Sequence, residues 1–387
     1  MQNEQLVSKL NDKRMKTRLK ALKALTQDSS SQTLVMEKDN NINCVFRTVY
    51  SCFDRSPSLA VYYTYKFGMP LTGIVDYASL SSAEELIKAE KEVGGTYYCG
   101  AEVAVKAPSG ERIILSAVGV PHKNVKAFND DLSSYRNKRL AFTNALREKL
   151  NAKFKKYSIS LPYAFWSLFG TVKTTSVEDL YVNLASKIIE KFKTADAITK
   201  FLTEDLALEI LDDEAKKLSD ESSTLYLFDL AYALKNKLKI KLPDEQLNTA
   251  DHFLALCKKY GAISSATYKG GKLEDFIKQI KILGINSATA EFSARSQEFM
   301  QEFYDKCIEN DVLPIVRTLF AHPRKKPDNK FLDVELAVKY NDTASCIVGH
   351  EISSSINPED GMFTPSTIER FPSILERIKL YSRVGTK

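Results

Sequence analysis

Histidines, paired cysteines and long apolar runs are scarce or missing in this sequence. Among 387 residues there are four histidines and six scattered cysteines. No two cysteines form a Cys-x-x-Cys pair, which disfavours a zinc knuckle or a disulfide framework and fits buried thiols in a reducing cytosol. No apolar run approaches the length of a membrane span, and the first ten residues are polar rather than signal-like. We therefore expect a cytoplasmic protein without membrane association.

Common nucleotide-binding and nucleophile motifs are missing as well. The sequence has no Gly-x-Ser-x-Gly elbow, no Walker-type loop and no Gly-x-Gly-x-x-Gly. Its net charge of +6 is mild for this length, so it permits weak attraction to polyanions without predicting it. The basic amphipathic segment 1–27 lacks interleaved aromatics, which favours a helical arm packed on the domain over a nucleic-acid or membrane-surface role. Nucleic acid is therefore an unlikely partner.

What the sequence does contain is an alternation of strands and helices. Apolar runs such as Ile74-Val75 end abruptly in a polar residue, and amphipathic helices such as 82–90 follow them. A hairpin-like pair is predicted at 102–106 and 112–118. After about 250 the pattern predicts strands at 262–268, 287–292, 313–318 and 346–350, and helices at 272–283 and 296–310. Helices between successive strands imply parallel order.

The stretch from Asn43 to Glu102 carries a family resemblance. It reads Asn-Cys-Val-Phe-Arg-Thr-Val-Tyr-Ser at 43–51, Ser-Pro at 56–57, Gly-Ile-Val-Asp-Tyr-Ala-Ser at 73–79 and Gly-Ala-Glu at 100–102. In order and spacing these segments resemble the standalone PHP-domain proteins of the polymerase and histidinol phosphatase superfamily. Those proteins read Asn-Asn-His-x-His-Thr-x-Tyr-Ser, Ser-Pro, Gly-Ile-Met-Asp-His-Asp-Ser and Gly-x-Glu.

The resemblance covers nearly the whole chain and implies a fold. The expected architecture is α/β, a distorted PHP-like (β/α) barrel with an N-terminal helical arm and a mainly helical insertion. The arm is expected at 1–30, the barrel at 31–135 and 251–387, and the insertion at 136–250, where long helical stretches dominate. In such a barrel the residues that follow each parallel strand line the functional mouth.

Most metal-ligand positions of the family are substituted. At five of these positions the family's histidine or aspartate is replaced by another residue: Val45, Arg47, Tyr77, Ala78 and Val118. Asp76 and Glu102 remain, and His122 is retained as the outer histidine of its segment. The family's late Glu-His pair falls on 320–321, where a shift of one residue would recover only His322.

A PHP site uses a cluster of imidazoles and carboxylates to hold two or three divalent metals, which activate water and neutralise a phosphoryl group. Because so few of these ligands remain, we interpret the chain as a degenerate PHP protein, a pseudoenzyme with no catalytic residues, no metal and no cofactor. The alternative is a metal-dependent phosphoesterase with a reduced site for manganese, zinc or iron, built from Asp76, Glu102, His322 and His350, with His122 as a further candidate.

Cations lie at or near several predicted strand ends, where guanidinium groups can bind phosphate or carboxylate bidentately. The resulting hypothesis is a metal-free site for a small anionic ligand at the barrel mouth. Its candidate residues are Arg47, Asp76, Tyr77, Glu102, His122, Lys269, Arg295, Arg317 and His322. Two other interpretations stay open: Arg47 pairs with Asp76 or Glu102 and merely plugs an inactive site, or the basic N-terminal helix binds an unknown protein partner. The oligomeric state is left undetermined.

Overall fold

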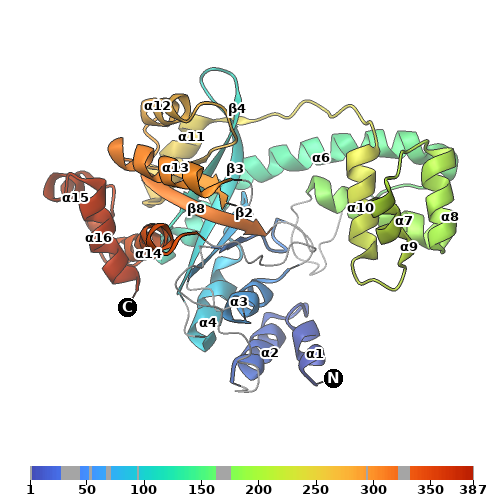
Figure 1. The fold of residues 1–387 in the computed structure, drawn as a ribbon, viewed down its shortest axis with the longest axis horizontal. Coiled ribbons are helices and arrows are strands. Elements are labelled where there is room, and N and C mark those ends of the chain that lie inside the picture. The colour runs from blue at the N-terminus through green and yellow to red at the C-terminus, as the bar shows by residue number, and fades with distance from the viewer. Residues whose placement is uncertain are drawn as a thin grey trace.

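The computed structural model describes residues 2–27, 44–51, 55–66, 71–93, 96–162, 176–292, 295–320 and 332–386. Within these ranges, seven strands close into a barrel that helices surround (Figure 1). In order around the ring the strands are β1 (Cys44–Phe46), β2 (Leu71–Tyr77), β3 (Thr96–Lys106), β4 (Arg112–Val118), β6 (Ile263–Thr267), β7 (Ser287–Glu291) and β8 (Leu313–Phe320). The pairing of β8 with β1 closes the ring. The predicted α/β barrel is therefore confirmed.

Strand β4 is antiparallel to both of its neighbours, whereas the other pairs in the ring are parallel. The two-residue strand β5 (Asn248–Thr249) extends the sheet beside β3, outside the ring. The C-terminal ends of the six parallel strands define the barrel mouth. Three of the four strands predicted after residue 250 are confirmed as β6, β7 and β8, and the predicted hairpin is confirmed as β3 and β4.

The helices follow the predicted alternation. Around the barrel lie α3 (Pro57–Lys66), α4 (Ala83–Val93), α5 (Val125–Asp131), α11 (Ala250–Tyr260), α12 (Leu273–Ile282), α13 (Gln297–Glu309), α14 (Val334–Ile356), α15 (Pro365–Arg370) and α16 (Ile374–Gly385). Between β4 and β5 come α6 (Ser133–Phe154), α7 (Val177–Phe192), α8 (Ala195–Lys200), α9 (Asp212–Ser219) and α10 (Tyr226–Lys237). Short helical segments are η3 (His122–Asn124), η4 (Lys155–Tyr157), η5 (Phe201–Asp205) and η7 (Pro358–Asp360).

Side chains of each strand alternate between the barrel interior and the surrounding helices. On β2, Val75 packs with Val45 and Tyr98 in one cluster, whereas Ile74 belongs to the larger cluster shared with the outer helices. Gly73 lies in the inner row, where an added Cβ would come within 2.4 Å of the Tyr98 ring. The interior near the N-terminal ends of the strands is therefore filled by apolar side chains.

The prediction of a strand at 346–350 is wrong, because these residues lie in the 23-residue helix α14. The first half of α14 packs on the outer cluster through Leu336 and Tyr340. Its second half packs through Ile347 and Val348 against the inner cluster, at the N-terminal end of the barrel. A short run such as Cys346-Ile347-Val348 is apolar in a buried strand and in a buried helix alike, so periodicity does not separate the two.

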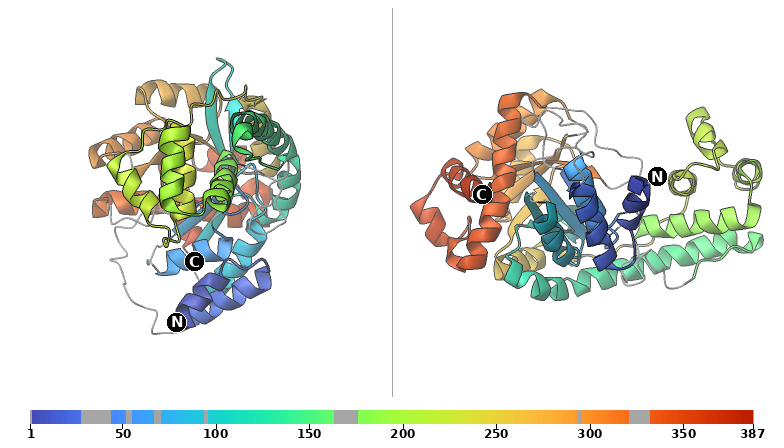
Figure 2. Two further views of the ribbon diagram at one scale, coloured as in Figure 1. Left: turned by 90° about the vertical axis from the view of Figure 1, so that its right-hand side faces the viewer. Right: turned by 90° about the horizontal axis from the view of Figure 1, so that it is seen from below.

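The region between β4 and β5 forms a lobe with a core of its own. Its buried residues come from α6 to α10, including Leu150, Leu184 and Leu230. Helix α6 begins on the barrel, where Tyr135 is part of the barrel core, and extends into the lobe (Figures 1 and 2). Figure 1 shows the tip of β8 pointing toward the side of the lobe, while α14 to α16 lie at the other end. In the described ranges no helix combines the length and apolarity that crossing a bilayer requires.

The N-terminal arm consists of two helices, α1 (Gln2–Lys9) and α2 (Met15–Gln27), and a buried ion pair joins it to the barrel. Arg18 of α2 donates to both carboxylate oxygens of Glu85 in α4, with 2.8 Å between Nε and Oε1. The Ser58 hydroxyl also donates to Glu85, and both charged residues are buried. One of the cations in the basic N-terminal segment is therefore used to hold the arm in place.

The contact between α14 and α16 generates a first prediction. At Gly349 an added Cβ would lie 1.9 Å from the backbone oxygen of Tyr381, and at Gly385 one would lie 2.0 Å from the oxygen of Ser345. We expect Gly349→Ala to lower the free energy of unfolding by about 2 kcal/mol or more, because the two backbones must separate. Urea denaturation followed by circular dichroism measures this. Ile352→Ala, on the exposed face of the same helix, is the control and should change stability by less than about 1 kcal/mol. Equal effects of the two substitutions would contradict the close-packing argument.

Candidate functional site at the barrel mouth

The centre of the barrel mouth is a buried carboxylate held between two guanidinium groups. Glu102 on β3 points into the barrel, and Arg317 on β8 donates through Nη2 to its Oε2 over 2.8 Å. Arg47, which directly follows β1, donates to the other oxygen, Oε1. Glu102 and Arg317 are 4% and 3% exposed, whereas a quarter of the Arg47 side chain reaches solvent. Three strands that are distant in the sequence thus meet at one acidic group.

The charges around Glu102 determine its protonation. Burial acts to raise the pKa of this carboxyl, but the positive charges of Arg317 and Arg47 outweigh it and lower the pKa to about 2. Glu102 is therefore ionised at every physiological pH. Both of its oxygens are committed to the two arginines, so the carboxylate acts as an anchor for cations.

A second carboxylate extends this network toward the surface. Glu291, the last residue of β7, lies 3.5 Å from Nη2 of Arg317 and 3.6 Å from Nζ of Lys269. More than half of the Lys269 side chain is exposed. Among the residues that the structure describes here, three cations (Arg47, Arg317 and Lys269) thus contact two carboxylates. Glu291 was not among the predicted site residues, although its position at the end of a predicted strand was a usable signal.

The side chain of Asp76 points away from the barrel interior, on the face of β2 opposite to Val75 and Tyr77. Its Oδ1 accepts hydrogen bonds from the Thr48 amide at 2.7 Å and the Ser51 hydroxyl at 2.6 Å, and its Oδ2 accepts from the Thr48 hydroxyl at 2.7 Å. The side chain is completely buried, and burial raises its pKa although these hydrogen bonds oppose the shift. Asp76 thus ties the turn after β1 to β2. The sequence analysis did not predict these contacts of Asp76 with Thr48 and Ser51.

Two further predicted residues make aromatic contacts. Tyr77 lies below the guanidinium of Arg139 in α6, with 5.0 Å between the Arg139 Cζ and the ring centroid. Arg295 lies over the rings of Tyr268 and Phe299, at 5.0 Å from each centroid. Such cation–π contacts keep a guanidinium near the surface while covering apolar rings. Among the described residues, Arg295 therefore contacts these two rings and not the carboxylates of Glu102 and Glu291.

His122 does not lie at the mouth. At the end of β4, Val118 pairs with Gly100 in β3 and with Ile263, the first residue of β6. Because β4 runs against its neighbours, the chain leaves it at the N-terminal end of the barrel. There His122 contacts Glu351 of α14, with 2.5 Å between Nε2 and Oε1, and this hydrogen bond raises the pKa of the imidazole.

His350 lies at the same end of the barrel. Its Nδ1 accepts from the Met362 amide at 2.9 Å, so Nε2 carries the proton and donates to the Gly261 carbonyl at 2.8 Å. Burial lowers the pKa of this imidazole to about 4, which keeps it neutral. His322 lies outside the described residues. The structure therefore brings together Arg47, Glu102, Arg317 and Lys269, and it places His122 and His350 elsewhere.

The described side chains at the mouth do not fit a multinuclear metal site. The side chains of Val45 and Arg47 offer no lone pair to a metal, and both oxygens of Glu102 already accept from guanidinium groups. Within the described ranges, no group of three or more His, Cys, Asp or Glu side chains is placed to hold a metal ion. The chemistry that this donor set favours is the binding of an anion by guanidinium and ammonium groups.

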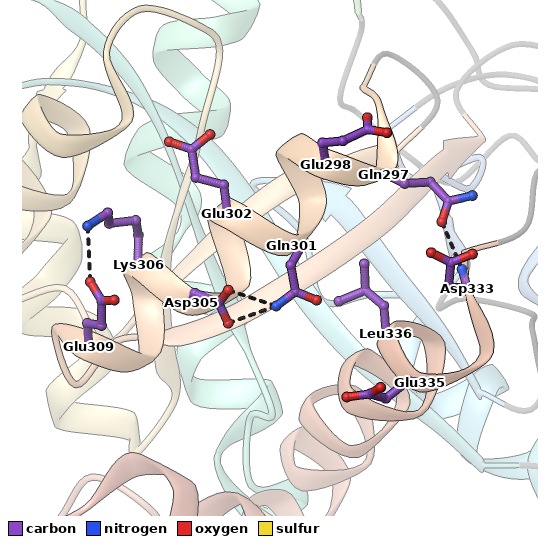
Figure 3. A pocket seen from close by; sticks show the side chains of 10 residues that line it. All are labelled: Gln297, Glu298, Gln301, Glu302, Asp305, Lys306, Glu309, Asp333, Glu335 and Leu336. Carbon is purple, nitrogen blue, oxygen red and sulfur yellow. Dashed lines mark hydrogen bonds and ion pairs between the residues drawn. The ribbon is translucent and has the colours of Figure 1, made fainter.

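A groove on the outer surface has the opposite charge. It lies between α13 and the start of α14, has a volume of about 700 Å³ and is lined by Glu298, Glu302, Asp305, Glu309, Asp333, Glu335, Gln297, Gln301, Lys306 and Leu336 (Figure 3). Several of these groups bond to their own neighbours, as Gln301 does to Asp305 and Lys306 to Glu309. Its carboxylates would repel an anion, so this groove does not compete with the mouth for one.

The fold is that of an α/β barrel protein, and comparison with solved structures supports this fold. No family model matches the chain, and no curated protein does. A solved amidohydrolase from Chromobacterium violaceum, with bound sulfate and no metal, is similar with a TM-score of 0.51 and 14% identity, over 77% of this chain and 96% of that one. A proposed metal-dependent phosphoesterase from Bifidobacterium adolescentis has a TM-score of 0.49 and 14% identity, over 78% of this chain and 96% of that one. At this identity the likeness to the amidohydrolase shows the barrel fold alone.

The ion-pair network predicts a stability effect with a defined pH dependence. Glu102→Gln leaves two guanidinium groups near the barrel interior without their carboxylate, so we expect a loss of about 3–5 kcal/mol in unfolding free energy at pH 7. The pKa of Glu102 falls from 4.5 to about 2 on folding. Its stabilisation is therefore complete above pH 4.5 and disappears as the pH falls toward 2.

Denaturant titrations of both proteins between pH 7 and pH 2.5 test this. The wild-type and Glu102→Gln curves should converge below pH 4.5. Glu291→Gln is the matched control and should cost about 1 kcal/mol or less, because Glu291 is more exposed and its contacts are longer. A pH-independent gap between wild type and Glu102→Gln would show that ionised Glu102 is not the source of the stability.

The contacts of Asp76 with Thr48 and Ser51 predict that its side-chain oxygens stabilise the fold as hydrogen-bond acceptors, whereas its negative charge is not needed for stability. Asn at this position keeps an oxygen for the Thr48 amide and the Ser51 hydroxyl, so Asp76→Asn should stay within about 1 kcal/mol of wild type. Since burial raises the Asp76 pKa above 3.8, the Asn variant should gain relative stability as the pH rises through and above that value. Asp76→Ala leaves buried donors unpaired and should cost about 3 kcal/mol. Thermal melts at pH 3.5 and 7 distinguish these outcomes, and equal losses for Asn and Ala would refute the argument.

Proposed function

We propose that this chain is a degenerate barrel protein of the PHP-like phosphoesterase type, in which the mouth binds a phosphate- or carboxylate-bearing ligand without a metal. The observation that carries the proposal is the commitment of Glu102 to Arg47 and Arg317. At a position that resembles a metal ligand of the PHP proteins, the carboxylate here accepts from cations of the chain itself. Guanidinium charge thus takes the place that metal charge has in a phosphoesterase.

The roles of the cations differ with their exposure. Arg317 is buried, so it holds Glu102 and shapes the floor of the site. Arg47 is partly exposed and Lys269 largely so, and together they present positively charged groups to an incoming anion. Arginine binds phosphate and carboxylate through its planar fork, and lysine adds a point charge. The sulfate in the similar amidohydrolase is consistent with an anion at this type of barrel.

Binding of inorganic phosphate and of phenyl phosphate, measured by isothermal titration calorimetry, tests the proposal. Wild type should bind at least one of them saturably, and Arg47→Met should weaken binding about tenfold or more. Arg47→Lys keeps a positive charge beside Glu102, which makes it the variant to use if the Met variant folds poorly. Lys20→Gln, on the exposed side of α2, removes one charge outside the Glu102 network and should leave binding unchanged.

Two results would overturn the proposal. If wild type binds neither compound at millimolar concentration, the arginines only neutralise Glu102 and close the mouth. If protein dialysed without chelator carries near-stoichiometric manganese, iron or zinc, the interpretation as a metal-dependent phosphoesterase is favoured instead. Hydrolysis assays on small phosphate esters would then follow.

A further inference from the structure

A second pocket lies at the N-terminal end of the barrel, beyond the apolar interior that separates it from Glu102. Its volume of about 840 Å³ falls within the range of about 300–1,000 Å³ that is usual for small organic ligands. Six parts of the chain form it: the second half of α11, the start of β6, the residues just before β7, segment η3, the second half of α14, and residues 358–365. Walls that come from so many elements enclose a ligand on several sides.

The floor of this pocket is fixed by hydrogen bonds within the protein. Ser264 and Asn286 exchange two of them, with 3.0 Å from the Ser264 hydroxyl to Oδ1 and 3.1 Å from the Asn286 amide to the Ser264 hydroxyl. His350 is bonded at both ring nitrogens, as described above. Because these polar groups are already paired within the protein, the floor keeps its shape without a ligand. A preformed site loses less conformational freedom on binding.

The rim of the pocket is basic. Lys123, Lys258 and Lys259 line it, and Glu359 is the one carboxylate among its lining residues. Lys259 is paired with Asp131 at 2.8 Å, so Lys123 and Lys258 supply most of the free positive charge. Apolar groups also line the pocket: Leu254, Pro121, Phe363 and Pro365. Its lining therefore suits a molecule with an anionic end and an apolar body.

An ion pair fixes the wall that carries Lys123. The neighbouring His122 binds Glu351 of α14, and the His122 amide donates to the Ser355 hydroxyl at 3.1 Å. Segment η3 is thereby attached to the same helix that supplies His350 and Ser354 to the floor. The position of Lys123 relative to the floor is thus set before any ligand arrives.

We propose that this pocket binds a small organic anion, one phosphate, sulfonate or carboxylate group on an apolar body of one or two rings. Lys123 and Lys258 attract the charged group, and the apolar wall of Leu254 and Phe363 covers the ring. This site is separate from the barrel mouth and does not depend on the function proposed there. It lies at the end of the barrel that carries no part of the Glu102 network.

Fluorescence titration of the full chain with 1-anilinonaphthalene-8-sulfonate tests the proposal, because this probe joins a sulfonate to aromatic rings. N-phenyl-1-naphthylamine has the same rings without the charge and serves as the neutral probe. We expect one saturable sulfonate-probe site in wild type. The double variant Lys123→Gln/Lys258→Gln should weaken the sulfonate probe about tenfold and the neutral probe less than about twofold. Ala255→Trp, at an exposed lining position of α11, should abolish binding of both.

The controls separate this pocket from the mouth and from general surface charge. Arg47→Met and Lys20→Gln should leave the affinity for the sulfonate probe unchanged. Loss of probe binding in Arg47→Met, or unchanged binding in both the lysine double variant and Ala255→Trp, would overturn the proposal. A thermal melt of each variant confirms that it is folded, and if Ala255→Trp fails to fold, the lysine double variant alone decides.

Discussion

The ionised carboxylate of Glu102 is the constraint on which the barrel mouth depends. A charge removed from water in this way is costly unless opposite charges and hydrogen bonds surround it, and removing one partner leaves the rest uncompensated. Here the compensation comes from Arg47 after β1 and Arg317 on β8, so three strands must close into a ring before the carboxylate is satisfied. The ion pairs therefore favour closure of the barrel at its mouth, while apolar packing does so at the other end.

Much of the barrel could be predicted from the sequence, because its strands are short apolar runs bounded by polar residues and separated by amphipathic helices. That pattern located β2, β6, β7 and β8. It failed at 346–350, where an equally apolar run is buried on all sides of a helix that passes from the outer surface to the end of the barrel. Burial on every side removes the periodicity that would distinguish helix from strand.

The candidate site was predictable in part. The sequence predicted that Arg47 could pair with Asp76 or with Glu102, because these charges lie at the ends of neighbouring strands. In the structure its partner is Glu102. The environment of Asp76 was not foreseen, because Thr48 and Ser51 are hydroxyl residues in a turn, with no sign in the sequence that they face one carboxylate. The resemblance to the PHP proteins made His122, which follows β4, a candidate for the mouth. The hairpin of β3 and β4 reverses that strand, so the histidine emerges at the opposite end.

The two ends of the barrel consequently have different chemistry. Between them lie the Tyr98 ring and the inner apolar cluster, with the paired hydroxyls of Ser265 and Thr289, 2.7 Å apart, nearer the middle. Helix α14 is one element that touches both regions, since Asp333 at its start bonds to Gln297 at the start of α13 while Glu351 binds His122 at the far end. A movement of this helix is one way in which the two ends could communicate. Its close backbone contacts with α16 at Gly349 and Gly385 oppose such a movement, because packed interfaces of this kind have few alternative arrangements. An anion at the mouth and an anion beside Lys123 are therefore expected to bind independently.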